Sequence, residues 1–170
     1  GEGAGAGAAL DANDLTLVSG ASVTMTQAQH QGFSGTVTAA GTEQITLSTA
    51  GTVTAKADIE TYVLAAAGGS NITLGANAQN VTTGASGADT ITVGTRTATG
   101  TFNTVAADII SLGDGADIKG VNGEGAGAGA ALDANDLTLV SGASVTMTAL
   151  QHDSFSGTVT ASGTEQIALS

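Results

Sequence analysis

Short triplets in which two apolar residues flank a third residue recur along the whole chain. This period of two predicts strands with one buried face. Further strands are expected around Val37, Val53, Val81, Phe102 and Ile118, and most steps between strand centres are eight to ten residues. The clearest triplets are Leu15-Thr16-Leu17, Val23-Thr24-Met25, Ile45-Thr46-Leu47, Tyr62-Val63-Leu64, Ile72-Thr73-Leu74, Ile91-Thr92-Val93 and Ile110-Ser111-Leu112.

Such spacing is compatible with an antiparallel sandwich or with a coiled parallel solenoid. Three observations favour the solenoid. Ile72, Ile91 and Ile110 follow at steps of 19, Glu60 follows Glu43 by 17, and residues 35–39 and 51–55 are near copies 16 apart. The predicted fold class is therefore all-β, a parallel β-solenoid of the β-roll or β-helix type. Each coil would contain two strands and span about 16–20 positions, as the repeat steps indicate.

Residues 1–48 occur a second time as residues 123–170, at a constant offset of 122. Tandem self-similarity is typical of repeat architectures. We interpret residues 1–122 as one complete unit of six coils, and residues 123–170 as the first part of the next unit in a longer array. The two copies differ only at Gln27/Ala149, Ala28/Leu150, Gln31/Asp153, Gly32/Ser154, Ala40/Ser162 and Thr46/Ala168.

A Gly/Ala stretch at residues 3–9, repeated at 125–131, interrupts the spacing. Leu137 follows Ile110 by a step of 27, which is longer than any single coil expected from the other steps. The stretch suits either a flexible linker or an extra strand packed against a neighbouring coil or chain. Elsewhere only residues 27–31 could form a helical turn, and a helix that short contributes little.

Charge limits the classes of partner. The net charge is −12, and Lys56, Arg96 and Lys119 are the only Lys or Arg residues in the sequence. Binding of nucleic acid or of anionic membranes requires many more cations. No apolar stretch long enough to span a membrane occurs, so no membrane insertion is expected. The lack of Cys is compatible with an extracellular protein without disulfides.

Residues 84–92, Gly-Ala-Ser-Gly-Ala-Asp-Thr-Ile-Thr, resemble the calcium nonapeptide G-G-x-G-x-D-x-U-x of RTX proteins, with Ala85 in place of the second Gly. Residues 112–117 are a partial second match, and Asp108 precedes Asp117 by nine residues. The strands that contain Glu43 and Glu60 look like the degenerate repeats of giant RTX-type adhesins and related bacterial surface proteins.

This resemblance implies a β-roll with Ca2+ held in turns between adjacent coils, where carboxylate and carbonyl oxygens suit calcium. Asp89 and Asp108 should share one edge, reached again after the insertion by residues 133–136, while Asp114 and Asp117 lie on the opposite edge. The alternative is that these side chains cap turns. The candidate ligands are Gly84, Gly87, Asp89, Asp108, Asp114, Asp117, Asp11, Asn13, Asp14, Asp133, Asn135 and Asp136.

The remaining side chains have simpler interpretations. His30 and His152 should be solvated loop residues, and no carboxylate is placed to orient them toward Ser34 or Ser156, so no enzyme is expected. The aromatic residues should fill the core. The threonines between apolar residues should point outward in stacked ladders, which also permits a face that binds ice.

We therefore expect a structural tandem repeat of a large protein, secreted or on the bacterial cell surface. Its partners would be its own adjacent units, stacked into a fibre or stalk of the adhesin or biofilm-matrix type. The alternative functions are a calcium-dependent adhesin binding module and a surface-layer lattice domain.

Overall fold

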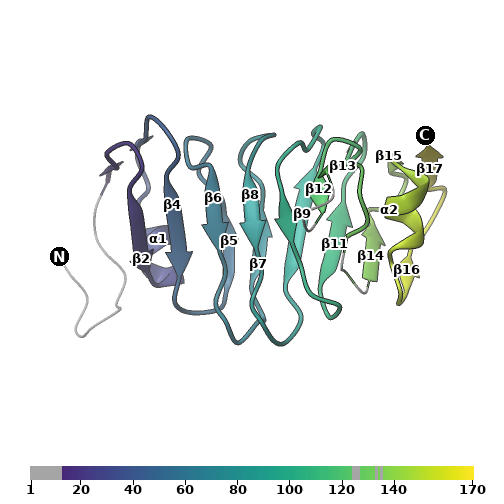
Figure 1. Cartoon of the computed structure of the whole chain (residues 1–170), viewed down its shortest axis with the longest axis horizontal. Coiled ribbons are helices and arrows are strands. Elements are labelled where there is room, and N and C mark those ends of the chain that lie inside the picture. Colours follow the sequence, from purple (N-terminus) through teal and green to yellow (C-terminus); the bar gives the residue numbers. More distant parts are fainter. Residues whose placement is uncertain (1–12, 124–126, 133, 135) are drawn as a thin grey trace.

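The computed structural model describes residues 13–123, 127–132, 134 and 136–170. The chain winds into a parallel β-solenoid of about seven turns, with its long axis along the stack of strands (Figure 1). The predicted fold class is confirmed, because every pairing between successive coils is parallel.

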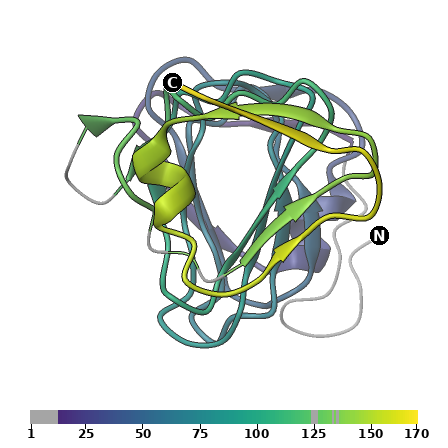
Figure 2. The ribbon, with the colours of Figure 1, turned by 90° about the vertical axis from the view of Figure 1, so that its right-hand side faces the viewer.

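Each turn has three sides, and Figure 2 shows the resulting triangular outline. One side is a five-stranded sheet of β2 (Ser22–Met25), β4 (Gln44–Leu47), β6 (Thr61–Val63), β8 (Asn80–Thr82) and β10 (Phe102–Asn103). The next is a six-stranded sheet of β5 (Thr52–Thr54), β7 (Asn71–Thr73), β9 (Thr90–Gly94), β11 (Ile109–Leu112), β14 (Asp136–Leu139) and β16 (Val159–Thr160).

The third side is less regular. It holds the paired strands β1 (Leu15–Thr16) and β3 (Val37–Thr38) at one end, and β15 (Ser144–Met147) and β17 (Gln166–Leu169) at the other. Between them it is formed by turns, joined by single bridges such as Thr97 to Asp117. The expected two strands per coil are found in the central coils, from β4 and β5 to β10 and β11, where the third side is a turn. The coils at the two ends carry a further strand on the third side.

Register follows the expected steps within the six-stranded sheet, where Ile72, Ile91 and Ile110 stack at steps of 19. Coil length varies more widely than expected. The shortest step joins Ile45 to its partner Tyr62, and a much longer one joins Val23 to Ile45. The near copies at residues 35–39 and 51–55 are not stacked: the first contains β3 on the third side and the second contains β5 in the six-stranded sheet.

The insertion leaves the solenoid as a small hairpin. Its strands are β12 (Asn122–Gly123) and β13 (Gly127–Ala128), which pair antiparallel. The chain then rejoins the stack, so that Leu137 pairs with Ile110 despite the long step between them. The described part of this stretch is thus an extra paired strand rather than a linker.

Two short helices interrupt the coils, α1 (Gln27–Gly32) and α2 (Ala149–Asp153). Each begins at a capping box in which a threonine and a glutamine three residues later bond each other's backbone N–H, as Thr26 and Gln29 do for α1. The local caps and the underlying coil stabilise a helix that would be too short on its own.

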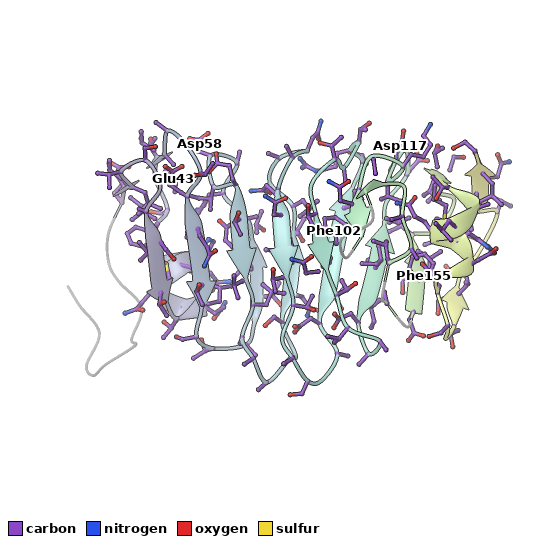
Figure 3. The ribbon with its side chains drawn as sticks, viewed as in Figure 1. Glu43, Asp58, Phe102, Asp117 and Phe155 are labelled. Carbon is purple, nitrogen blue, oxygen red and sulfur yellow. The ribbon has the colours of Figure 1, made fainter. Side chains whose placement is uncertain are left out.

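The core runs along the solenoid axis and consists of the inward residue of each strand. Ile45, Ile72, Ile91 and Ile110 are fully buried. The four aromatic residues are buried as expected, and Figure 3 shows Phe102 within the stack. Threonines alternate outward, as expected, and one column of the six-stranded sheet reads Thr54, Thr73, Thr92, Ser111, Thr138 and Thr160.

Candidate functional site: the turn-closing carboxylates

Asp89 and Asp108 lie one above the other at the corner that leads into the six-stranded sheet, and both are fully buried. Asp89 accepts the N–H of Ser70 in the preceding coil at 2.7 Å and the N–H of Gly84 in its own turn at 2.7 Å. Asp108 accepts the N–H of Asp89 at 2.9 Å. Each carboxylate therefore joins two coils.

Asp108 makes two further bonds, to the N–H of Val105 at 2.8 Å and to the hydroxyl of Thr83 at 2.6 Å. Where the chain turns a corner, the backbone N–H of one coil no longer faces a carbonyl of the next, and a buried unpaired N–H is costly. A carboxylate supplies the missing acceptor through strong charge-assisted bonds. Asp89 and Asp108 therefore cap backbone N–H groups at the turns, as the alternative to calcium binding predicts.

Gly84 and Gly87 allow the turn before Asp89 to stack on the coil below. A Cβ on Gly84 would collide with the carbonyl oxygen of Ala65, and one on Gly87 would lie 2.7 Å from that of Ala67. Gly87 also has a φ of +79°, which favours glycine. The nonapeptide-like glycines therefore have a packing role that does not depend on a metal.

The other candidate ligands are distributed over different corners. Asp136 lies next to Ile109 in register and donates its N–H to the carbonyl of Asp108, while its carboxylate accepts the N–H of Thr158 at 2.7 Å. Its first-copy counterpart Asp14 accepts Thr36 N–H in the same way, but on the third side. The carbonyl of Asn13 accepts the N–H of Gly35.

Asp114 and Asp117 lie apart from Asp89, as expected. Asp114 accepts the N–H of Ser144 at 2.9 Å, and Asp117 accepts that of Lys119 and lies 3.6 Å from its Nζ. Asp11, Asp133 and Asn135 are outside the described residues. Within the described ranges, no three His, Asp or Glu side chains gather as a metal site would require. The calcium expectation stays a prediction.

A second column of turn-closing side chains was missed by the sequence reasoning. Glu43, Glu60 and Gln79 each stand two residues before an inward residue of the five-stranded sheet. Glu60 accepts the N–H of Glu43 at 2.9 Å, just as Asp108 accepts that of Asp89. Gln79 accepts two N–H groups of its own turn. Their common position, two residues before the buried residue of each strand, is the sequence signal that could have identified this column.

Glu43 is fully buried, and Figure 3 shows it at the upper edge of the stack. Its Oε1 accepts the N–H of Gly20 at 3.1 Å, while its Oε2 has no hydrogen-bond partner among the described residues. Its copy Glu165, which no further coil covers in this structure, uses both oxygens, for the N–H groups of Gly142 and Gly163. Hydrogen bonds from backbone N–H groups, its own first among them, lower the pKa of Glu165.

His30 is buried, which contradicts the expectation of a solvated loop histidine. Its Nε2 lies 3.1 Å from the hydroxyl of Tyr62, which also accepts the N–H of Lys56 at 2.8 Å. Burial, and to a lesser extent the charge of Lys56, lowers the pKa of His30 to about 4. Burial likewise raises the pKa of Tyr62. The sequence pattern could not show that the next coil would cover α1.

His152 occupies the equivalent place in α2, and its side chain is 39% exposed. No coil with a counterpart of Tyr62 follows it in this structure. Its Nδ1 lies 3.2 Å from Oδ1 of Asp153, so the expectation that no carboxylate lies beside these histidines is wrong for this copy. The structure therefore shows one copy of this helix, α1, covered by a following coil, and the other copy, α2, without one.

No protein-family model, curated protein or solved structure matches this chain. Among the described residues, no helix is long and apolar enough to cross a membrane.

Proposed function

We propose that this chain is a segment of a structural tandem-repeat array, which extends as a fibre or stalk from a large secreted or cell-surface bacterial protein of the adhesin type. The observation that carries this proposal is the pairing of β11 with β14. These strands belong to different sequence units, yet Ile109 to Leu112 pair with Asp136 to Leu139 without a shift in register. The boundary between units is therefore also a continuous parallel sheet.

The second unit also docks on the first through specific polar contacts. Gln151 of α2 is buried and donates from Nε2 to the carbonyl of Ile118 at 2.8 Å, and the backbone N–H of Ser144 donates to Oδ1 of Asp114 at 2.9 Å. Satisfied buried polar groups fix one arrangement of the two units. We expect a stiff array, because the described part of the junction is joined by the β11–β14 pairing and by these side-chain bonds.

The other face of the same helix is seen in the first copy. There Lys56 donates from Nζ to the carbonyl of Phe33 at 2.8 Å, and both Gln27 and Gln31 donate to the carbonyl of Thr52. Phe33 recurs as Phe155, so we expect the Lys56 contact at each unit, whereas Gln27 and Gln31 are replaced by Ala149 and Asp153 in the second copy and their bonds to Thr52 belong to the first copy.

The net charge of −12 and the small, β-branched composition support a solvated surface structure rather than a binder of nucleic acid. The adhesin assignment and the surface location rest on the resemblance of residues 84–92 to RTX repeats. Antibody labelling of intact source cells tests that location. Labelling only after lysis would contradict it.

The fibre proposal is tested by chains with one, two or three copies of residues 1–122 placed before residues 123–170. At about 4.8 Å per coil, each added unit should lengthen the particle by about 27 Å. Electron microscopy or solution scattering measures this length. A particle that grows in all dimensions, or a string of separately tumbling bodies, would contradict a continuous fibre.

A further inference from the structure

Equivalent elements of the two units lie on different sides of the solenoid. In the first unit, β2 is an outer strand of the five-stranded sheet, and α1 lies against β5 on the six-stranded side, where Gln27 and Gln31 bond Thr52. Strand β3 follows α1 and precedes β4, so it belongs to the third side.

In the second unit, the counterpart of β1 is β14, and it lies in the six-stranded sheet. The counterpart of β2 is β15, whose Thr146 bridges Asp117, which in turn bridges Thr97, on the third side. Viewed along the axis, α2 and α1 lie on different sides of the triangle (Figure 2). Every element has moved by one side.

The cause is the number of sides in one unit. Val23, Ile45, Tyr62, Val81 and Phe102 stack in successive turns. One turn after Phe102, Asn122 bridges Thr101. The chain has therefore completed five full turns between Val23 and Asn122. The chain then crosses the six-stranded sheet at β14 and reaches β15 on the third side. One unit therefore contains five turns and two sides, and the expected six coils per unit is wrong.

We propose that every further unit of the array is rotated by one side in the same sense, so that three consecutive units place the same helix on three different sides. The inference rests on the proposed array of such units. Each unit covers five turns and two sides, which is one side less than six full turns. If every unit has this same number of sides, each one begins one side away from the unit before it. The pattern of sides returns after three units.

This rotation determines how any feature that occurs once per unit is displayed. Four of the six differences between the copies lie at the helix, at Gln27/Ala149, Ala28/Leu150, Gln31/Asp153 and Gly32/Ser154. Gln31 is exposed in α1, where the following coil is present. Helix surfaces that vary between units would therefore face outward in three directions along one fibre, instead of forming a single stripe.

The test is electron cryomicroscopy of a chain with three copies of residues 1–122 before residues 123–170, labelled through cysteines at Gln31 and its equivalents. The matched control carries labels at Ser111 of one unit and at Thr138 of the next unit. These two residues are partners in adjacent strands of the six-stranded sheet. The helix labels of successive units should differ in direction by a third of a turn, while each control pair coincides.

Helix labels aligned on one side of a straight fibre would overturn the rotation and leave the fibre proposal standing. Loss of the fibre, seen as separate bodies with unrelated label directions, would overturn both. Coincident control labels with helix labels spread over three sides would support both.

Discussion

Ile110 and Leu137 lie opposite each other in adjacent parallel strands, although they belong to different sequence units. The chain between them includes the third-side turn and the hairpin of β12 and β13. The hairpin absorbs the extra length outside the stack, so the buried column of the six-stranded sheet continues without a gap. Coil length can thus vary while the core register is kept.

Replacing Asp89 by Asn should destabilise the fold. The amide would turn an NH2 group toward either Ser70 N–H or Gly84 N–H, and one buried donor would lose its acceptor. We expect a loss of about 2 kcal/mol in the free energy of unfolding. Urea unfolding measures it, and Asp58→Asn, a change at an exposed turn residue, is the matched control. Equal midpoints for both variants would show that Asp89 does not clamp the coils.

Gly84→Ala should cost more than Gly142→Ala, although only Gly142 has a positive φ, of +77°. A Cβ at Gly142 meets nothing within 4 Å, so its cost is the backbone strain alone, about 1 kcal/mol. A Cβ at Gly84 meets the backbone of Ala65 and must push two coils apart, for which we expect about 3 kcal/mol. Thermal or urea unfolding distinguishes the two. The reverse order would mean that the coils do not approach closely there.

Mild acid should weaken the packing around His30. The unfolded chain binds a proton near pH 6.5, whereas the folded chain does so only near pH 4, because the imidazole is buried. The stability associated with neutral His30 is therefore complete above pH 6.5 and is lost as the pH falls toward 4. The loss between pH 6.5 and 4.5 should be about 2 kcal/mol.

This contribution is separated from the titration of the carboxylates by comparing variants. His30→Phe should show a shallower decline of unfolding free energy over that pH range than the unchanged chain. His152→Phe, at the partly exposed copy, is the matched variant. A His30 variant with the full original pH dependence would refute the burial of this side chain.

Calcium removal should leave the solenoid folded. The oxygens of Asp89 and Asp108 already accept N–H and O–H donors, so the coils are joined at that corner without a metal. Circular dichroism after dialysis against a chelator should retain the β-sheet signal. Added Ca2+ that binds the folded chain would still raise the midpoint of unfolding by mass action. Loss of structure in the chelator, restored by Ca2+, would instead support the RTX-like role of the candidate ligands.

The strands were predictable because each presents a short alternation with one large apolar residue directed inward. The triplets at Ile45, Ile72, Ile91 and Ile110 all form strands, and the parallel stacking follows from their steps. The number of sides was not predictable, since turns such as that around Thr97 carry no apolar alternation. Ile118 is fully buried, yet its neighbour Asp117 forms only isolated bridges instead of a strand.

The candidate site was predictable in part. The repeat step of 19 indicated that Asp89 and Asp108 share an edge, and they do. The sequence could not distinguish a carboxylate that binds a cation from one that accepts backbone N–H groups, because both uses require Asp beside a Gly-rich turn. Only the resemblance to RTX-type repeats points to Glu43 and Glu60 in the sequence. The burial of His30 is not predictable from its own segment, because Tyr62, which covers it, comes from a later coil.

The continuity of the solenoid across the unit boundary is tested most directly by a distance between spin labels. The chain has no Cys, so Thr54→Cys and Thr160→Cys can be labelled selectively. These residues occupy one outward column of the six-stranded sheet, five coils apart, and Thr24 with Asn103 provides a control pair inside one unit. The account predicts a narrow distribution near about 24 Å, as sharp as that of the control. A broad distribution for Thr54 and Thr160, beside a narrow one for the control pair, would contradict it.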